Sequence, residues 1–526
     1  MHRSSRSSRS FKHSPDLSAF LRGSLLLTLS GVAAKLCGAL FRLPLTALLG
    51  GTGMGYYSTA YGLFLPLYAV LVTGLSTAVA RPVAGCAGRG DFAGAVKIRR
   101  TARWLFLVTG LLGTAAALMG ARGFTVASTG SEEACPAVLM IAPAILLCSL
   151  TAVERGYYEG LCDMRPTAVS QAVEAVCKLV LGLWLCQRFL REPPAVLARC
   201  PRDVCGACGA VLGVTLSSLG GWLCVLPFGW RRGRISTSSP LSTRDVLREL
   251  YAVLIPVSLG ALVTNLTSLL DLVTVMRMLP KGEDPAFVYG SFMGMAVAVF
   301  SLVPSLTNLL AKGVLPCAAQ AWAKGDRAQT AALAANALSL TGLVSLPAGC
   351  GIFVLARGCL EFLFAGRDAE IAASYQSLQA LAPAVICLCL TYPAFSLLQA
   401  IGKAQLPVYL MLPALAVKLA GNLLLVPRYG VTGAGISTSL CYAVILTGAL
   451  LALRRALGEP LQLRRFLLPQ SFSALACASA AWVVYSRMIG SFPQRIAFLC
   501  AAGAGGCAYF GTLLLVRHDE CVVRSS

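Results

Sequence analysis

Long apolar segments recur along the whole chain and constrain its fold more than any other feature. A helix needs about 20 mostly apolar residues to cross the hydrocarbon core of a bilayer, and fourteen stretches of the 526-residue sequence reach about this length. They are residues 23–49, 58–80, 104–120, 136–153, 168–187, 208–230, 249–279, 289–311, 331–356, 376–401, 406–426, 431–453, 466–486 and 496–516. Because backbone groups in lipid must be satisfied within each segment, the pattern predicts an all-α polytopic membrane protein.

The composition excludes most other classes of protein. Charged residues make up 13% of the chain, about half the share of a soluble protein, and 57% of the residues are hydrophobic. These values exclude a soluble enzyme, a disordered chain and a small disulfide-stapled domain. The three histidines are His2, His13 and His518, all near the ends, and no nucleotide-binding loop or pair of catalytic carboxylates is evident. We therefore expect no enzyme activity, no cofactor and no metal site.

The basic residues indicate how the chain is oriented in the membrane. With the N-terminus in the cytoplasm, 28 of the 44 Lys and Arg residues fall on the cytoplasmic side, 12 on the opposite side and four within spans. This bias follows the positive-inside rule and predicts that both termini are cytoplasmic, with an uncleaved first span. The formal charge of +22 is then explained by orientation, and we expect no nucleic-acid partner.

An internal repeat predicts two lobes. Residues 157–179 and 397–419 share a loop followed by a span at an offset of 240, which aligns Lys178 with Lys418. Six spans separate the two segments, so the repeat predicts two parallel six-helix bundles with the substrate between them. The expected domains are a basic tail (1–22), an N-terminal lobe (23–230), a linker (231–248), a C-terminal lobe (249–453), and two further helices with a C-terminal tail (454–526).

Four cations lie inside predicted spans, where each costs roughly 2.5–3.5 kcal/mol on insertion scales. They are Lys35, Arg42, Lys178 and Lys418. Lys35 and Arg42 are seven residues apart and project from nearly the same helix face. Either they face a cavity and bind an anion, or they are structural charges that snorkel or form ion pairs. Lys418 has no acidic neighbour in its own span, which makes it a further candidate for contacting an anion.

The acidic and amide residues in the spans suggest partners for these cations. Asn265 and Asp271 lie on the seventh span; if this span faces the first one, Asp271 pairs with Lys35 or Arg42, either as a gate or as a static contact. Glu174 precedes Lys178 by four residues, a spacing that favours an ion pair within one helix. The cysteines on the predicted outer side, Cys135, Cys200, Cys205 and Cys208, lack the histidines of a zinc site, and a disulfide among them stays open.

Several stretches resemble one transporter family. The first is SGVAAKLCGALFRLPLTALLGGTGMGYYSTAY (residues 30–61), and residues 155–179, 288–326 and 397–440 agree with it. They resemble the stage V sporulation protein B and polysaccharide-exporter branch of the multidrug/oligosaccharidyl-lipid/polysaccharide (MOP) flippase superfamily. The resemblance implies about 14 transmembrane helices in two pseudo-symmetric six-helix lobes around a central cavity, plus two C-terminal helices, working by alternating access.

The resemblance also implies a substrate and a set of binding residues. The chain is similar to lipid II flippases, in which cations of the first and eighth helices meet the pyrophosphate of the lipid. The first-helix cations match Lys35 and Arg42, whereas the only eighth-helix candidate is Lys312, at the inner end of its span. We expect Lys35, Arg42, Lys418 and Asn265 to bind the substrate, and Asp271, Glu174 and Lys178 to form gating or structural charge pairs.

The expected function is that of a flippase in the bacterial cytoplasmic membrane. Its substrate would be an undecaprenyl-pyrophosphate-linked cell-wall or polysaccharide precursor, and in the sporulation branch this means spore cortex synthesis. We expect a monomer in contact with membrane lipid, and H⁺ or Na⁺ coupling stays open. Two alternatives remain: a cation-coupled drug exporter of the same superfamily, and a non-transporting scaffold for peptidoglycan synthesis.

Overall fold

The computed structural model describes residues 17–525 apart from 231–240, 281, 404 and 459–462. The side chains of Lys35 and Lys312 lie outside the described set. All the named elements of the described part are helices. The fold-class prediction, an all-α polytopic protein, is therefore confirmed.

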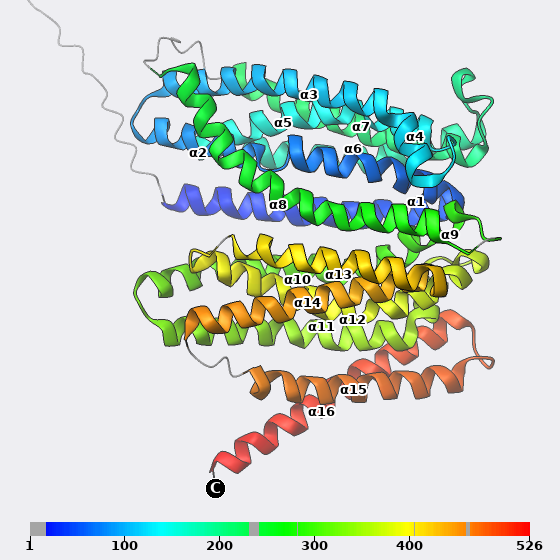
Figure 1. Ribbon diagram of the computed structural model, residues 1–526. Helices are drawn as coiled ribbons and strands as arrows, with labels where there is room; N and C mark the ends of the chain where they lie inside the picture. Colours follow the sequence, from blue (N-terminus) through cyan, green and yellow to red (C-terminus); the bar gives the residue numbers. More distant parts are fainter. Residues whose placement is uncertain (1–16, 231–240, 281, 404, 459–462, 526) are drawn as a thin grey trace, which may run out of the picture.

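The helices form two lobes and an appendage (Figure 1). The N-terminal lobe contains α1 (Leu17–Leu71), α2 (Leu75–Gly88), α3 (Phe92–Thr129), α4 (Cys135–Ile141), α5 (Pro143–Gly160), α6 (Arg165–Arg191), η1 (Ala195–Leu197) and α7 (Arg202–Trp230). The C-terminal lobe contains α8 (Thr243–Met278), α9 (Pro285–Ser291), the π-helix η2 (Phe292–Ala296), α10 (Val297–Ala323), α11 (Arg327–Leu363), α12 (Asp368–Ala400), α13 (Leu406–Tyr429) and α14 (Val431–Leu457). The appendage, α15 (Leu463–Met488) and α16 (Gln494–Ser525), packs against α11.

The first element turns back on itself at Gly50. This residue has φ +67° and ψ −169°, a backbone conformation that glycine adopts without steric cost. The two predicted spans on either side of it thus become antiparallel arms of α1, which Figure 1 shows running out and back. Within the described residues, 13 helical segments are long and apolar enough to cross a membrane, and the first of them, Leu40–Gly88, joins the end of the first predicted span to the second.

Helix α8 connects the two lobes and belongs to the core of both. Its first turns place Val246, Leu250 and Leu254 in a core cluster with residues of α2 and α3. Its last turns place Leu272 and Val275 in the core of the C-terminal lobe. In Figure 1 this helix runs diagonally across the N-terminal lobe and ends beside α9. Its position therefore depends on how the lobes sit relative to each other.

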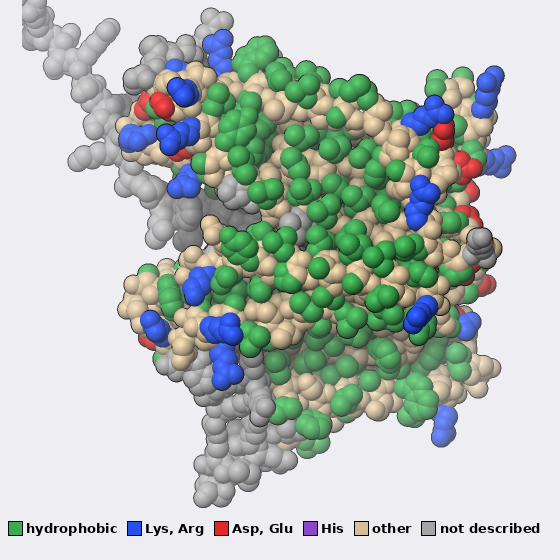
Figure 2. All heavy atoms as spheres, in the orientation of Figure 1, with side chains coloured by type: hydrophobic (Ala, Val, Ile, Leu, Met, Phe, Trp, Pro, Cys, Tyr) green, Lys and Arg blue, Asp and Glu red, His purple; other side chains and the backbone are tan. Residues whose placement is uncertain are grey.

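The two ends of the bundle differ in how closely the lobes approach. We define the near end as the one where α2 ends and α3 begins, and the far end as the one where α3 ends. Figure 2 shows an indentation between the lobes at the near end, on the left, and contact between them towards the far end. At the far end Arg277 of α8 donates to the carbonyl oxygens of Ala127 (2.9 Å) and Val126 (2.6 Å) at the end of α3. A cation is favourable there because the C-terminal end of a helix carries a partial negative charge.

Two further contacts close the far end. Arg367, which precedes α12, donates to the carbonyl oxygen of Ala47 at 2.6 Å. At the second contact, a Cβ atom added to Gly290 of α9 would stand 1.8 Å from the carbonyl oxygen of Gly51. Only glycine at position 290 allows this approach of the two backbones, so the contact between α1 and α9 depends on it.

Helix α3 begins before the predicted third span, and the charges of its near end pair with a buried carboxylate. Glu154 of α5 is 1% exposed and accepts hydrogen bonds from Arg99 and Arg103 of α3, whose Nε atoms lie 2.9 Å from its oxygens. One buried carboxylate therefore holds two arginines one helical turn apart. The predicted third span, 104–120, did not include either arginine.

We predict that Gly290→Ala separates the lobes at the far end. The added methyl group overlaps a backbone oxygen that cannot rotate away, and overpacking of this kind costs typically 1–3 kcal/mol. Hydrogen exchange followed by mass spectrometry should show faster exchange in residues 47–55 and 285–291.

Gly351→Ala in α11 is the matched control, because a Cβ atom there meets nothing within 4 Å. Unchanged exchange at the far end in Gly290→Ala would contradict the role assigned to this contact.

Candidate anion-binding site

Arg42 projects from the first arm of α1 towards the π-helix of the C-terminal lobe. Its guanidinium donates a hydrogen bond to the carbonyl oxygen of Met293. One turn further on, the hydroxyl of Thr46 donates to the carbonyl oxygen of Gly294 at 3.0 Å. A π-turn disturbs the regular ladder of a helix and is frequent at functional sites, and here its carbonyls accept side chains from the opposite lobe. Arg42 is half-buried, and the described residues give its charge no carboxylate partner.

Lys178 of α6 lies on the same aromatic patch as Arg42. Its ammonium is 3.3 Å from the hydroxyl of Tyr61 and 5.3 Å from the ring centroid of Phe41. Tyr57 lies beside Tyr61 with ring centroids 4.8 Å apart and the rings tilted by 37°, and both tyrosines are near Arg42. Two cations thus share one patch of aromatic rings and hydroxyls, which solvates positive charge without neutralising it.

The predicted pairing of Glu174 with Lys178 is wrong. Glu174 instead pairs with Arg155 of α5, with 2.7 Å between Nη2 and Oε2, and Arg155 also donates to the hydroxyl of Ser170. The helical spacing allowed the first pairing, but the neighbouring helix supplies a guanidinium that binds both Glu174 and Ser170. This partner leaves Lys178 to the aromatic patch.

Asp271 was predicted to pair with Lys35 or Arg42, but among the described side chains its basic partner is Lys418. The Lys418 ammonium lies 2.6 Å from Oδ1 of Asp271, and it also donates to the carbonyl oxygen of Ala434 (3.1 Å) and to the hydroxyls of Ser437 (3.2 Å) and Thr438. Lys418 is only 1% exposed. A charge this deeply buried is stable only when it is paired and hydrogen-bonded, and this cage of oxygens from α8 and α14 meets both conditions.

Asn422 extends the same network by one turn of α13. Its amide nitrogen donates to Asp271 Oδ1 and to Thr274 Oγ1, both at 2.8 Å, and its amide oxygen accepts from the hydroxyl of Ser437. Asp271, Lys418 and Asn422 thereby tie three helices, α8, α13 and α14, into one unit.

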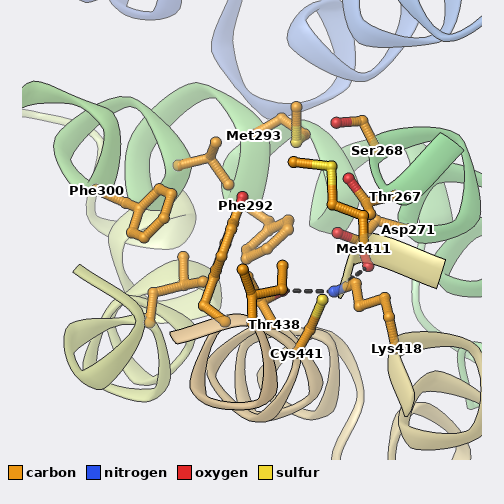
Figure 3. Close-up of a pocket in the computed structure, with 14 residues that line it drawn as sticks. Thr267, Ser268, Asp271, Phe292, Met293, Phe300, Met411, Lys418, Thr438 and Cys441 are labelled. Carbon is orange, nitrogen blue, oxygen red and sulfur yellow. Dashed lines mark hydrogen bonds and ion pairs between the residues drawn. The ribbon is translucent and has the colours of Figure 1, made fainter. Parts of the chain in front are cut away.

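A cavity of about 120 Å³ lies beside this ion pair. Figure 3 shows Asp271, Lys418 and Thr438 on one side of it and the rings of Phe292 and Phe300 on the other. Met293, whose carbonyl binds Arg42, also contributes to its wall. The π-helix therefore lies between the Arg42 contact and the ion pair of the C-terminal lobe.

The remaining predicted site residues are placed as follows. Lys35 lies on α1 and Lys312 on α10, but their side chains are outside the described set. Asn265 is half-buried and donates to the carbonyl oxygen of Ala261 in its own helix at 2.8 Å. Cys135, Cys200, Cys205 and Cys208 are free thiols. No group of three or more metal-ligating side chains occurs among the residues that were described.

Sequence reasoning missed three parts of this arrangement: the aromatic patch, the oxygen cage and the π-helix. No role was predicted for Tyr57 and Tyr61, although their spacing of four residues places both on one face of a helix. Ser437 and Thr438 carried no signal, because hydroxyls are common in membrane helices. A π-helix such as residues 292–296 has no recognisable sequence pattern.

Comparison with known proteins identifies the family. The family model described as "Lipid II flippase MurJ" matches residues 99–498. The chain belongs to the MurJ lipid II flippase family. The Lipid II flippase MurJ of Bacillus subtilis (strain 168) is 22% identical over 520 residues, which cover 94% of each chain. Stage V sporulation protein B of the same organism is 23% identical over 310 residues, 56% of this chain and 57% of that one.

A solved structure agrees with the MurJ assignment at the level of the fold. "Lipid II flippase MurJ, inward closed conformation" superposes with a TM-score of 0.73 at 14% identity and covers 95% of this chain and 100% of that chain. The match to the family model confirms the family resemblance inferred from the residues.

We predict that Lys418→Met destabilises the protein strongly, because it leaves the carboxylate of Asp271 buried without its cation. Removal of one member of a buried ion pair costs about 3–5 kcal/mol. Adding Asp271→Asn to Lys418→Met should recover part of the loss, and thermal unfolding of the two single variants and the double variant in detergent measures the coupling.

Lys178→Met, at the corresponding position of the repeat, is the control. It removes one hydroxyl contact and two ring contacts and should cost about 1–2 kcal/mol. Strictly additive losses for Asp271→Asn and Lys418→Met would contradict the pairing.

Proposed function

We propose that this protein translocates a polyprenyl-pyrophosphate-linked cell-wall precursor across the cytoplasmic membrane by alternating access. Its membership of the MurJ family supports this function, and the observation that carries it is the pair of cations, Arg42 and Lys178, which have no carboxylate partner among the described residues. By contrast, the membrane-embedded carboxylates Glu154, Glu174 and Asp271 each have a basic partner. The unneutralised positive charge suits a doubly charged phosphate group.

In this mechanism the pyrophosphate binds at Arg42, with Lys35 and Lys178 as further cationic ligands. A charge-assisted hydrogen bond to phosphate is stronger than the bond that Arg42 now makes to a neutral carbonyl. Binding would therefore draw Arg42 away from Met293 and remove one link between α1 and the π-helix. Rocking of the lobes would then open the far end, while the polyprenyl tail stays in the bilayer.

We infer that the near end faces the cytoplasm. The support is the excess of Lys and Arg in the connections at that end, as the positive-inside rule requires. Both termini would then be cytoplasmic. The indentation between the lobes at the near end (Figure 2) would admit the head group from the inner leaflet.

The alternatives fit the ion pairs less well. A cation-coupled exporter would need a membrane carboxylate available for H⁺ or Na⁺, but Asp271 is held by Lys418 and Glu174 by Arg155. A scaffold without transport activity would give no reason to keep two cations in membrane-spanning helices without a carboxylate, since insertion of each costs roughly 2.5–3.5 kcal/mol. Because Lys418 is paired with Asp271, we propose a static structural role for Lys418 rather than substrate binding.

We predict that the double variant Lys35→Ala, Arg42→Ala loses transport but inserts normally in the membrane. Each hydrogen bond to a charged group is worth about 1.5–3 kcal/mol, so transport should fall by roughly 100-fold or more. The measurement is exposure of a lipid-linked precursor in proteoliposomes, detected by a reagent confined to one side.

The matched control is Arg122→Ala with Arg188→Ala, which removes the same charge from two exposed ion pairs at the far end. Transport by the control should stay near the wild-type rate. It should also stay there when choline replaces Na⁺, because Asp271 and Glu174 are held by basic partners. Full transport activity of the Lys35→Ala, Arg42→Ala variant would contradict the proposal that these two residues bind the pyrophosphate.

A further inference from the structure

A groove on the lipid-facing side of the N-terminal lobe has a second set of cations. It lies at the near end between the first turns of α3 and the start of α8, with a volume of about 620 Å³. Two of its lining residues, Lys97 and Arg100, are basic, and none of the described lining residues is acidic. The site is separate from the patch around Arg42, which lies between the lobes.

The neighbouring charges make these two cations distinct from the rest of α3. Arg99 and Arg103 instead form ion pairs with Glu154 of α5. Lys97 uses one of its donors on the carbonyl oxygen of Leu241, just before α8, and an ammonium has three donors. Arg100 is exposed and makes no ion pair with a described residue. The part of the groove lined by Lys97 and Arg100 therefore carries net positive charge.

Further along α3, beyond Lys97 and Arg100, the wall of the groove becomes apolar. Trp104 is 62% exposed and follows Arg100 by one turn of α3, and Val108 follows by another. Leu247 of α8 faces them across the groove. Tryptophan is enriched at the depth where head groups meet acyl chains. Cations followed by an indole and then by aliphatic side chains match the order of phosphate, glycerol backbone and acyl chain in a phospholipid.

We propose that this groove binds an anionic phospholipid, with its phosphate at Lys97 and Arg100 and an acyl chain along Trp104 and Leu247, and that the bound lipid holds the start of α8 against the N-terminal lobe. Charge complementarity selects an anionic head group over a zwitterionic one. The start of α8 packs on the N-terminal lobe through Val246 and Leu250, and a lipid between α3 and α8 adds contacts to both. The lipid content of the membrane thereby biases how the lobes are arranged.

The test is native mass spectrometry of the full chain released from micelles that contain equal amounts of phosphatidylglycerol and phosphatidylcholine. Wild type should retain phosphatidylglycerol in preference. Each cation near an anionic surface is worth about fivefold in affinity, so Lys97→Ala with Arg100→Ala should weaken retention by roughly 25-fold.

Arg454→Ala with Arg455→Ala is the matched control. It removes two exposed arginines from the last turn of α14, at the same end of the bundle but outside the groove, and should leave retention within about twofold of wild type. Equal retention of the two lipids by wild type, or an equal loss in the control, would overturn the proposal. So would displacement of phosphatidylglycerol by free glycerol phosphate, because the acyl chain would then contribute nothing.

A second variant keeps the test decisive if the loss of the Lys97 contact to Leu241 disturbs folding. Arg100→Glu changes an exposed side chain only and reverses its charge. Phosphatidylglycerol should slow hydrogen exchange in residues 243–254 of wild type. It should leave the exchange of the same residues in Arg100→Glu unchanged. Equal protection in both proteins would contradict the site, and neither readout depends on transport.

Discussion

The structure depends on the requirement that charge buried in a membrane be neutralised. Lys418 and Asp271 satisfy it for each other at 2.6 Å, and the surrounding hydroxyl, amide and carbonyl groups complete the hydrogen bonding of both. Since these groups come from α8, α13 and α14, the pair determines how three helices of the C-terminal lobe assemble. Glu154 does the same for α3 and α5 in the N-terminal lobe, where it holds two arginines.

Two cations inside the protein do not meet this requirement, because no described carboxylate neutralises them. Arg42 contacts a neutral carbonyl, and Lys178 contacts a hydroxyl and aromatic rings. These groups reduce the cost of burying a cation but leave its charge available to an anion. The contacts of Arg42 and Thr46 also cross from α1 to the π-helix, so that a ligand at this point acts directly on the interface between the lobes.

Much of this architecture follows from the sequence. The apolar segments predict an all-helical membrane protein, and the repeat that aligns Lys178 with Lys418 predicts two related lobes. Pairing in three dimensions is what the sequence could not specify. Glu174 and Lys178 are correctly spaced within one helix, yet Arg155 of another helix takes the carboxylate. Lys418 was predicted to contact an anion because its partner, Asp271, lies 147 positions away in the sequence.

The central claim is that Arg42 exchanges a backbone carbonyl for the pyrophosphate of a lipid. The most direct measurement is a structure of the protein determined with bound undecaprenyl pyrophosphate. The account predicts that the phosphate oxygens lie within hydrogen-bonding distance of Arg42 and that its bond to the carbonyl of Met293 is broken. A pyrophosphate bound elsewhere, with Arg42 still donating to Met293, would contradict it.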